Sequence, residues 1–144
     1  WIWQVIECIS PRIVIAEYNS VFGPKARVTV PYDPGFIRAE KHGSKLYYGA
    51  SLSALDFLAQ GKGYRLVAGN SAGNNVFFVR EDCLAGLRPC LPEEAYVQAA
   101  FRESRDARGV VTLASFSERQ QAIASLPLID VATNSVTTLA DQLS

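Results

Sequence analysis

The stretch Trp1-Ile-Trp-Gln-Val-Ile-Glu-Cys-Ile-Ser-Pro-Arg-Ile-Val-Ile-Ala-Glu-Tyr-Asn19 decides the fold that we expect for this chain of 144 residues. Four apolar residues of its first half recur at helical spacing: Ile2, Val5, Ile6 and Ile9. They predict a helix over residues 1–9 with one buried stripe. Ser10-Pro11 ends that helix, because proline disfavours the helical conformation in the residue before it. The run Ile13-Val-Ile-Ala16 is continuous and mainly β-branched, which is typical of a strand buried on both faces of a parallel sheet.

A helix that leads into a buried strand is the middle of an α/β unit, so we expect the chain to begin inside a larger α/β domain. Residues 19–46 are rich in apolar side chains, which predicts an ordered loop packed over one end of the sheet. A second helix is expected over residues 50–60. The strands expected at 64–68 and 76–80 flank the turn Gly69-Asn-Ser-Ala-Gly-Asn-Asn75, which predicts an antiparallel hairpin.

Composition changes after about residue 80, where most of the local signals become helical. Pro92 followed by two acids predicts a helix over residues 92–101. Either Ser115 or Ser117 is expected to cap a helix over residues 117–126, with a short strand after it.

Charge and composition exclude several classes of function. The chain has 14 basic and 14 acidic residues, and this neutral balance argues against a nucleic-acid-binding protein. No run approaches the roughly 18 consecutive apolar residues of a membrane span. Three cysteines without a CxxC pair and one histidine, His42, are too few for a zinc site. We therefore expect no metal, and a cytoplasmic protein that acts on a small molecule.

The order of helix, parallel strand, helix and antiparallel hairpin predicts an α/β fold. It is the pattern of the closing half of a Rossmann-like, methyltransferase-type sheet. Two stretches carry a resemblance: residues 11–24 with Val30-Pro-Tyr-Asp-Pro34, and Gly63 to Arg80. They resemble the later region of uncharacterised SAM-dependent methyltransferase-like proteins of the FkbM type. Residues 1–82 are thus expected to form the later half of such a domain, and residues 83–144 a mainly helical extension packed on it.

The resemblance implies S-adenosylmethionine (SAM) as cofactor and places its glycine-rich binding loop upstream of Trp1. The glycines of this chain do not follow a strand and open a helix, as a dinucleotide-binding loop must. No residue of this chain is therefore assigned to the cofactor.

Candidate site residues follow from the rule that ligands of open α/β sheets bind beyond the carboxyl ends of the strands. Glu17, Tyr18 and Asn19 end the first expected strand. We predict Glu17 as a catalytic general base and Tyr18 and Asn19 as substrate-binding residues. The alternative for Glu17 is a structural role, paired with an arginine or capping backbone groups.

Tyr32 and Asp33 are further substrate-binding candidates, because the flanking Pro31 and Pro34 stiffen their loop. The alternative is a turn in which Asp33 bonds its own backbone. Structural roles are favoured for the remaining polar and aromatic candidates: core packing for Tyr47 and Tyr48, turn geometry for Asn70, Asn74 and Asn75, and solvation for His42.

The sequence predicts the C-terminal part of a SAM-dependent methyltransferase that contributes substrate-side residues for a small-molecule or glycan-like substrate. The alternative is a non-catalytic α/β binding or assembly module without its own cofactor site. A third interpretation, a hydrolase or transferase with Glu17 and Asp33 as paired acids, has no nucleophile elbow or triad order to support it. Half a sheet leaves an edge strand and an apolar face exposed, so we expect self-association or pairing with a missing N-terminal part.

Overall fold

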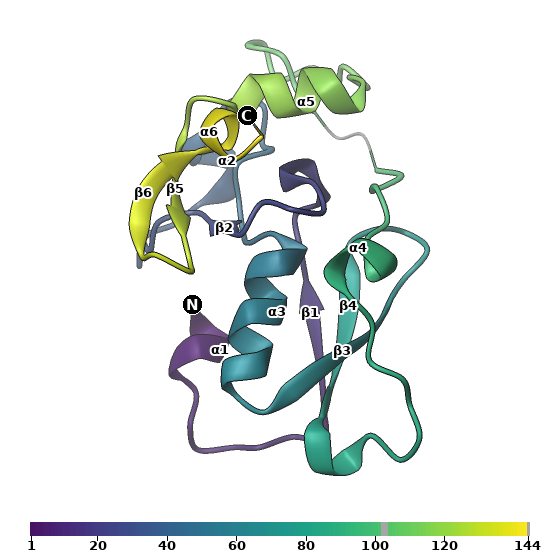
Figure 1. Ribbon diagram of the computed structural model, residues 1–144. Coiled ribbons are helices and arrows are strands. Elements are labelled where there is room, and N and C mark those ends of the chain that lie inside the picture. Colours follow the sequence, from purple (N-terminus) through teal and green to yellow (C-terminus); the bar gives the residue numbers. More distant parts are fainter. Residues whose placement is uncertain (102–103, 144) are drawn as a thin grey trace.

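The computed structural model describes residues 1–101 and 104–143 and contains two small three-stranded sheets (Figure 1). The first sheet has the order β1 (Ile13–Glu17), β4 (Asn75–Arg80), β3 (Tyr64–Gly69). The second has the order β2 (Val28–Thr29), β5 (Pro127–Asp130), β6 (Ser135–Thr138). Every strand pair among the described residues is antiparallel, so the fold is α+β.

The prediction of an α/β sheet with a parallel strand is therefore wrong. It rested on the apolar run from Ile13 to Ala16, which was expected to be buried on both faces. β1 is an edge strand that pairs only with β4, antiparallel, with Glu17 opposite Asn75. Ile13 and Ile15 are 57% and 62% exposed, so only the face of Val14 and Ala16 is covered. A β-branched run favours a strand but does not reveal whether one or both of its faces are buried.

The predicted hairpin of β3 and β4 is confirmed, with Tyr64 opposite Arg80 at its open end. Its turn depends on Asn70, whose Oδ1 accepts the backbone N–H groups of Gly73, Asn74 and Asn75 at 3.1–3.2 Å. This is the turn chemistry that favoured a structural role for these asparagines.

The helix α3 (Leu52–Gly61) covers one face of the first sheet, much as predicted (Figure 1). Ser51 caps it, and its hydroxyl accepts the N–H of Ala54 at 3.1 Å. Together, the helix and the sheet bury one core cluster: Tyr18, Leu52, Ala59, Tyr64, Leu66, Val76, Phe78 and Ala95.

The first helix is shorter than the spacing of its apolar residues predicted. α1 spans only Ile2–Val5, and the expected buried stripe is exposed, with Ile2 and Val5 at 75% and 74%. Trp3 packs on the sheet instead, with its ring centroid 5.7 Å from Tyr64 and 5.2 Å from Phe78. Trp3, rather than the apolar stripe, thus anchors this segment on the sheet, because a large aromatic side chain buries more apolar surface than one isoleucine.

The long loop after β1 is ordered, as expected, and contains η1 (Ser20–Phe22), β2 and α2 (Arg38–Lys41). It builds a second core with side chains from the other end of the chain: Val21, Phe22, Ala26, Val28, Val30, Leu46, Tyr47, Ile123, Leu128 and Leu139. The loop therefore brings residues some 100 positions apart into one cluster.

The C-terminal part is not the expected helical extension. Its described residues, up to 101 and from 104 to 143, contain η2 (Glu81–Cys83), three short helices and two strands. The helices are α4 (Pro92–Ala95), α5 (Phe116–Ile123) and α6 (Leu139–Gln142). β5 pairs with β2, placing Val28 opposite Asp130, so the C-terminal strands complete a sheet that begins in the N-terminal loop.

The helix expected over residues 92–101 stops at Ala95 because tertiary contacts occupy the backbone that follows. Val97 exchanges two hydrogen bonds with the Tyr18 hydroxyl, and Ala99 N–H donates to Ser20 Oγ at 3.1 Å. The Ser115 cap of α5 is confirmed by a full capping box with Glu118.

Gly69→Ala should destabilise the fold, because a Cβ at this position would lie 2.2 Å from the Ala95 carbonyl oxygen. Such overpacking costs about 1–3 kcal/mol. Gly61→Ala is the matched control: nothing lies within 4 Å of its Cβ, and alanine in α3 should add stability of up to ~1 kcal/mol. Urea denaturation of both variants measures the difference, and equal stabilities would show that α4 does not pack on β3 as described.

Candidate functional site

A pocket of about 230 Å³ lies at the carboxyl end of β1. Side chains from five separate segments line it, among them Glu17, Asn19, Arg38, Tyr48, Asn74 and Arg119. The end of β1, the loop that carries α2, the hairpin turn and α5 thus converge on one polar hollow. This is where the strand-end rule placed the predicted site, although the sheet is not parallel.

Glu17, the predicted general base, is exposed at the last position of β1. Its carboxylate makes no hydrogen bond or ion pair with any residue in the ranges 1–101 and 104–143. The structural alternative, a pair with an arginine or a backbone cap, is therefore not seen in the described part of the chain. The carboxylate is available to a ligand in the pocket.

Asn19 lies in the wall of the pocket and is almost completely buried. Its Nδ2 donates to the carbonyl oxygens of Leu46 and Tyr48 at 2.8 and 3.0 Å, and its Oδ1 accepts the N–H of Val21 at 3.1 Å. The amide is thus engaged on both sides by backbone. In this geometry the Asn19 side chain holds the backbone segments that form the pocket wall.

Tyr18 is held in the same way. Its hydroxyl donates to the Val97 carbonyl at 2.7 Å and accepts the Val97 N–H at 3.1 Å. Burial raises the pKa of Tyr18, and the bond to Val97 opposes that shift in part. Neighbouring Tyr96 has its pKa raised to about 12, by burial and then by Tyr18, so both phenols stay neutral at ordinary pH.

Two guanidinium groups face the pocket. Arg38, on α2, donates from Nε to the Lys45 carbonyl at 2.7 Å and lies 3.7 Å over the ring of Tyr48. Arg119, on α5, is 2% exposed and donates from Nη1 to the Phe101 carbonyl at 3.1 Å. With Glu17, the pocket lining therefore contains both positively and negatively charged groups.

Tyr32 and Asp33 lie outside this pocket. Asp33 accepts the N–H of Gly35 at 2.8 Å and pairs with Lys41, and the hydrogen bond from Lys41 holds the pKa of the Asp33 carboxyl below its usual value. Tyr32 packs edge-on against Trp1, with ring centroids 5.8 Å apart. Asp33 therefore adopts the turn that was the alternative, and it does not share a site with Glu17.

The remaining sequence candidates divide between core and surface. Tyr47 is buried and its hydroxyl donates to the Pro127 carbonyl, whereas Tyr48 lines the pocket. His42 hydrogen-bonds Ser44 through Nδ1 at 2.7 Å. Sequence reasoning missed Arg38 and Arg119, because no spacing links Arg38 to β1 and α5 was assigned to a separate extension.

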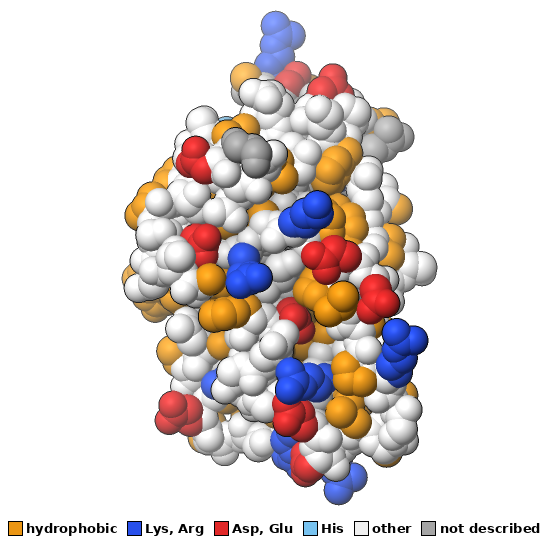
Figure 2. Space-filling view, viewed as in Figure 1, with side chains coloured by type: hydrophobic (Ala, Val, Ile, Leu, Met, Phe, Trp, Pro, Cys, Tyr) orange, Lys and Arg blue, Asp and Glu red, His pale blue; other side chains and the backbone are white. Residues whose placement is uncertain are grey.

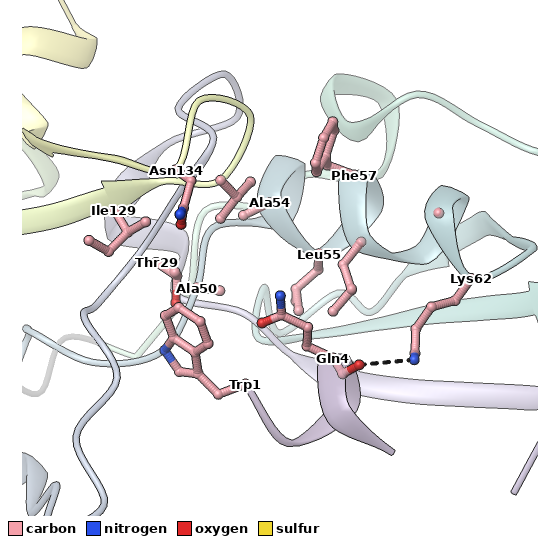
Figure 3. A pocket seen from close by; sticks show the side chains of 13 residues that line it. Trp1, Gln4, Thr29, Ala50, Ala54, Leu55, Phe57, Lys62, Ile129 and Asn134 are labelled. Atoms are coloured by element: carbon pink, nitrogen blue, oxygen red, sulfur yellow. Dashed lines mark hydrogen bonds between the residues drawn. The ribbon is translucent and has the colours of Figure 1, made fainter. Parts of the chain in front are cut away.

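A second pocket, of about 290 Å³, lies between α3, Trp1 and the β5–β6 hairpin (Figure 3). Its walls are mainly apolar, with Leu55, Leu58 and Ile129 among them. Of the lining side chains in the described part of the chain, Lys62 alone carries a charge, and its Nζ donates to the Gln4 carbonyl at 3.1 Å. This pocket has no carboxylate among its described lining residues, and its lysine is already bonded to backbone, so the polar pocket is the stronger candidate site.

The surface carries no basic stripe on the face that Figure 2 draws, where acidic and basic side chains are interspersed. Within the described ranges no group of three or more His, Cys, Asp or Glu side chains is placed to hold a metal ion, and no helix has the length and apolarity needed to cross a membrane. Cys8, Cys83 and Cys90 are all free thiols.

Comparisons with known proteins give no match: no family model, no curated protein and no solved structure resembles this chain significantly.

Tyr18→Phe should destabilise the protein by about 1–3 kcal/mol, because it leaves the Val97 N–H and carbonyl without their buried partner. Tyr32→Phe removes the same hydroxyl from a side chain that is 66% exposed and should be neutral. Thermal denaturation of both variants tests this expectation. Equal melting temperatures would contradict the role given to Tyr18.

Proposed function

We propose that this chain provides the substrate-side pocket of a SAM-dependent methyltransferase acting on a small-molecule or glycan-like substrate. The observation that carries the proposal is Glu17, whose carboxylate faces a polar pocket at the carboxyl end of β1 without a partner in the described residues. The resemblance carried by residues 11–24, 30–34 and 63–80 supports the reaction class. The proposal does not use the parallel sheet, which the strand pairing contradicts.

The size of the pocket suits a small ligand or one end of a larger one. Its volume of about 230 Å³ lies just below the ~300–1,000 Å³ typical of pockets for drug-sized ligands. Most groups that reach it are polar, which favours a hydroxylated substrate over an apolar one. The interspersed charges and zero net charge agree with a small substrate.

The chain's own residues do not fit SAM. The candidate glycines lie at the end of α3, at the start of β3 and in the hairpin turn, and none joins a strand to the start of a helix within residues 1–101 and 104–143. We therefore assign the cofactor to no residue here and derive no step through it.

Glu17 has one role in this proposal, which is to accept the proton of a substrate hydroxyl as that oxygen becomes a nucleophile. An exposed carboxylate at a strand end meets the geometric need for a general base, since it lies on the pocket wall. The side-chain hydrogen bonds of Tyr18 and Asn19 hold the backbone that follows Glu17 in place.

Glu17→Gln should lower the turnover number of methyl transfer by about 100-fold or more, because general-base catalysis contributes that much. The natural gene product that contains residues 1–144 would be incubated with tritium-labelled SAM and a panel of monosaccharides and small hydroxylated compounds. Glu7→Gln, an exposed carboxylate outside this pocket, is the matched control and should keep wild-type turnover. Absence of transfer to every acceptor, or equal turnover in both variants, would contradict the proposal.

A second candidate function, assembly through the β1 edge, is favoured by a separate observation. Arg12 accepts the backbone N–H of Arg80 on β4, and Tyr18 donates to the carbonyl of Asn74 just before β4. By alternation, the backbone groups of Ile13, Ile15 and Glu17 point away from β4. The edge is therefore open, and its two isoleucines are more than half exposed. Open, apolar edge strands are templates for pairing with another strand.

We propose a second copy of this chain as the partner of that edge. Arg12 and Glu17 are exposed and lie at opposite ends of β1. Antiparallel pairing of two β1 strands around Ile15 brings the basic end of one copy next to the acidic end of the other. Parallel pairing would place like charges together, so the charge pattern selects the antiparallel dimer.

Ile15→Lys should raise the dissociation constant of this dimer by about tenfold or more, because a charge would enter its apolar centre. Val136→Lys makes the same change at another exposed residue, 74% exposed on β6, and should leave association unchanged. Sedimentation equilibrium over a range of concentrations measures both. A wild-type protein that remains monomeric throughout would exclude this function.

A further inference from the structure

We propose that the pocket at the carboxyl end of β1 recognises an anionic group of its substrate, a carboxylate or a phosphate, through Arg38. This inference rests on the proposed function only in taking this pocket as the substrate site. It adds the chemical class of the ligand.

Arg38 is fixed from two sides before any ligand arrives. Its Nε donates to the Lys45 carbonyl at 2.7 Å, and its Cζ lies 3.7 Å from the centroid of the Tyr48 ring. Lys45 is itself held in a tight turn, with φ of 58° and a backbone bond of 2.9 Å to His42. The position of the guanidinium is thus set by backbone and ring.

The remaining donors of Arg38 are left for a ligand. Nη1 and Nη2 make no hydrogen bond or ion pair with a residue in the described ranges, and Arg38 lines the pocket. Two adjacent N–H groups of a guanidinium match the two oxygens of a carboxylate or phosphate, and such bidentate pairs are the strong class of hydrogen bond. Because the side chain is already ordered, binding loses little of its rotamer freedom.

The other charged groups around the pocket agree with an anionic ligand. Arg119, a buried residue of α5, places a second guanidinium in the lining. Among the described residues that line the pocket, Glu17 is the one carboxylate. A ligand that puts its anion on Arg38 therefore keeps a hydroxyl, rather than the anion, for Glu17.

A purely structural Arg38 is the competing explanation, since the same contacts tie Lys45 and Tyr48 together. The two explanations differ in charge selectivity. A structural arginine affects all ligands equally, whereas an anion-binding arginine distinguishes a charged sugar from a neutral one of the same size.

The test is titration of the whole protein with three probes: D-glucuronate, D-glucose 6-phosphate and D-glucose. Binding is followed by the backbone amide signals of Glu17 and Asn74 in ¹H–¹⁵N spectra, without SAM. We expect at least one anionic probe to bind about tenfold or more tightly than glucose. The better of the two anions identifies the carboxylate or the phosphate as the group recognised. That preference should shrink as the salt concentration rises.

Arg38→Gln should abolish the preference for the anion and leave glucose binding unchanged. Arg88→Gln, which removes a guanidinium on a side chain that is 89% exposed, should preserve it. If Arg38→Gln does not fold, Arg38→Lys replaces it, with a reduced preference expected because lysine lacks the planar fork. Equal binding of all three probes, binding of none, or an equal loss for charged and neutral probes would overturn the proposal. Because no methyl transfer is measured, these outcomes are independent of whether the protein is a methyltransferase.

Discussion

The buried amide of Asn19 is the interaction on which the rest of this structure depends. Its Nδ2 holds the carbonyls of Leu46 and Tyr48, its Oδ1 holds the N–H of Val21, and its own N–H donates to Ala50. Each buried polar group of this kind is costly to leave unpaired, so the whole set forms together. Through it the end of β1, the turn of η1 and the segment before α3 become one rigid unit, and the two apolar cores meet there.

That unit explains why a chain with so little regular structure has a defined pocket. Most helices are a single turn, and β2 has two residues. Local propensity cannot stabilise such short elements, because helix nucleation is costly and short strands need partners. Long-range bonds do so instead: Tyr18 and Ser20 hold residues 97 and 99, and β5 returns to β2. The pocket is lined by residues of the segments that these long-range hydrogen bonds hold together.

Features that depend on distant contacts could not be predicted from the sequence, whereas features determined by neighbouring residues could. α3, the β3–β4 hairpin and the Ser115 cap were predicted because neighbouring residues determine them. The parallel sheet and the helix over 92–101 were wrong, because exposure of Ile15 and the bonds of Val97 are set by segments far away in the chain. A rule about strand ends, which needs only the strand, placed Glu17 at the end of β1 where the pocket lies, and its catalytic role stays a prediction. Arg38 could not be found, since its relation to Glu17 exists only after the loop has folded over β1.

The backbone that carries Glu17 and the Arg38 guanidinium are nevertheless connected by a short chain of contacts. Glu17 is two residues before Asn19, Asn19 holds the Tyr48 carbonyl, and the Tyr48 ring supports the Arg38 guanidinium. A ligand anchored on Arg38 therefore lies in the same pocket as the exposed Glu17 carboxylate. Binding a substrate at one group holds it close to a second group, and such positioning is one way in which binding energy contributes to catalysis. Glu17 also supplies the acidic end of β1 that antiparallel pairing sets beside the basic end of a second copy. Association through the β1 edge and binding in the pocket therefore share this residue.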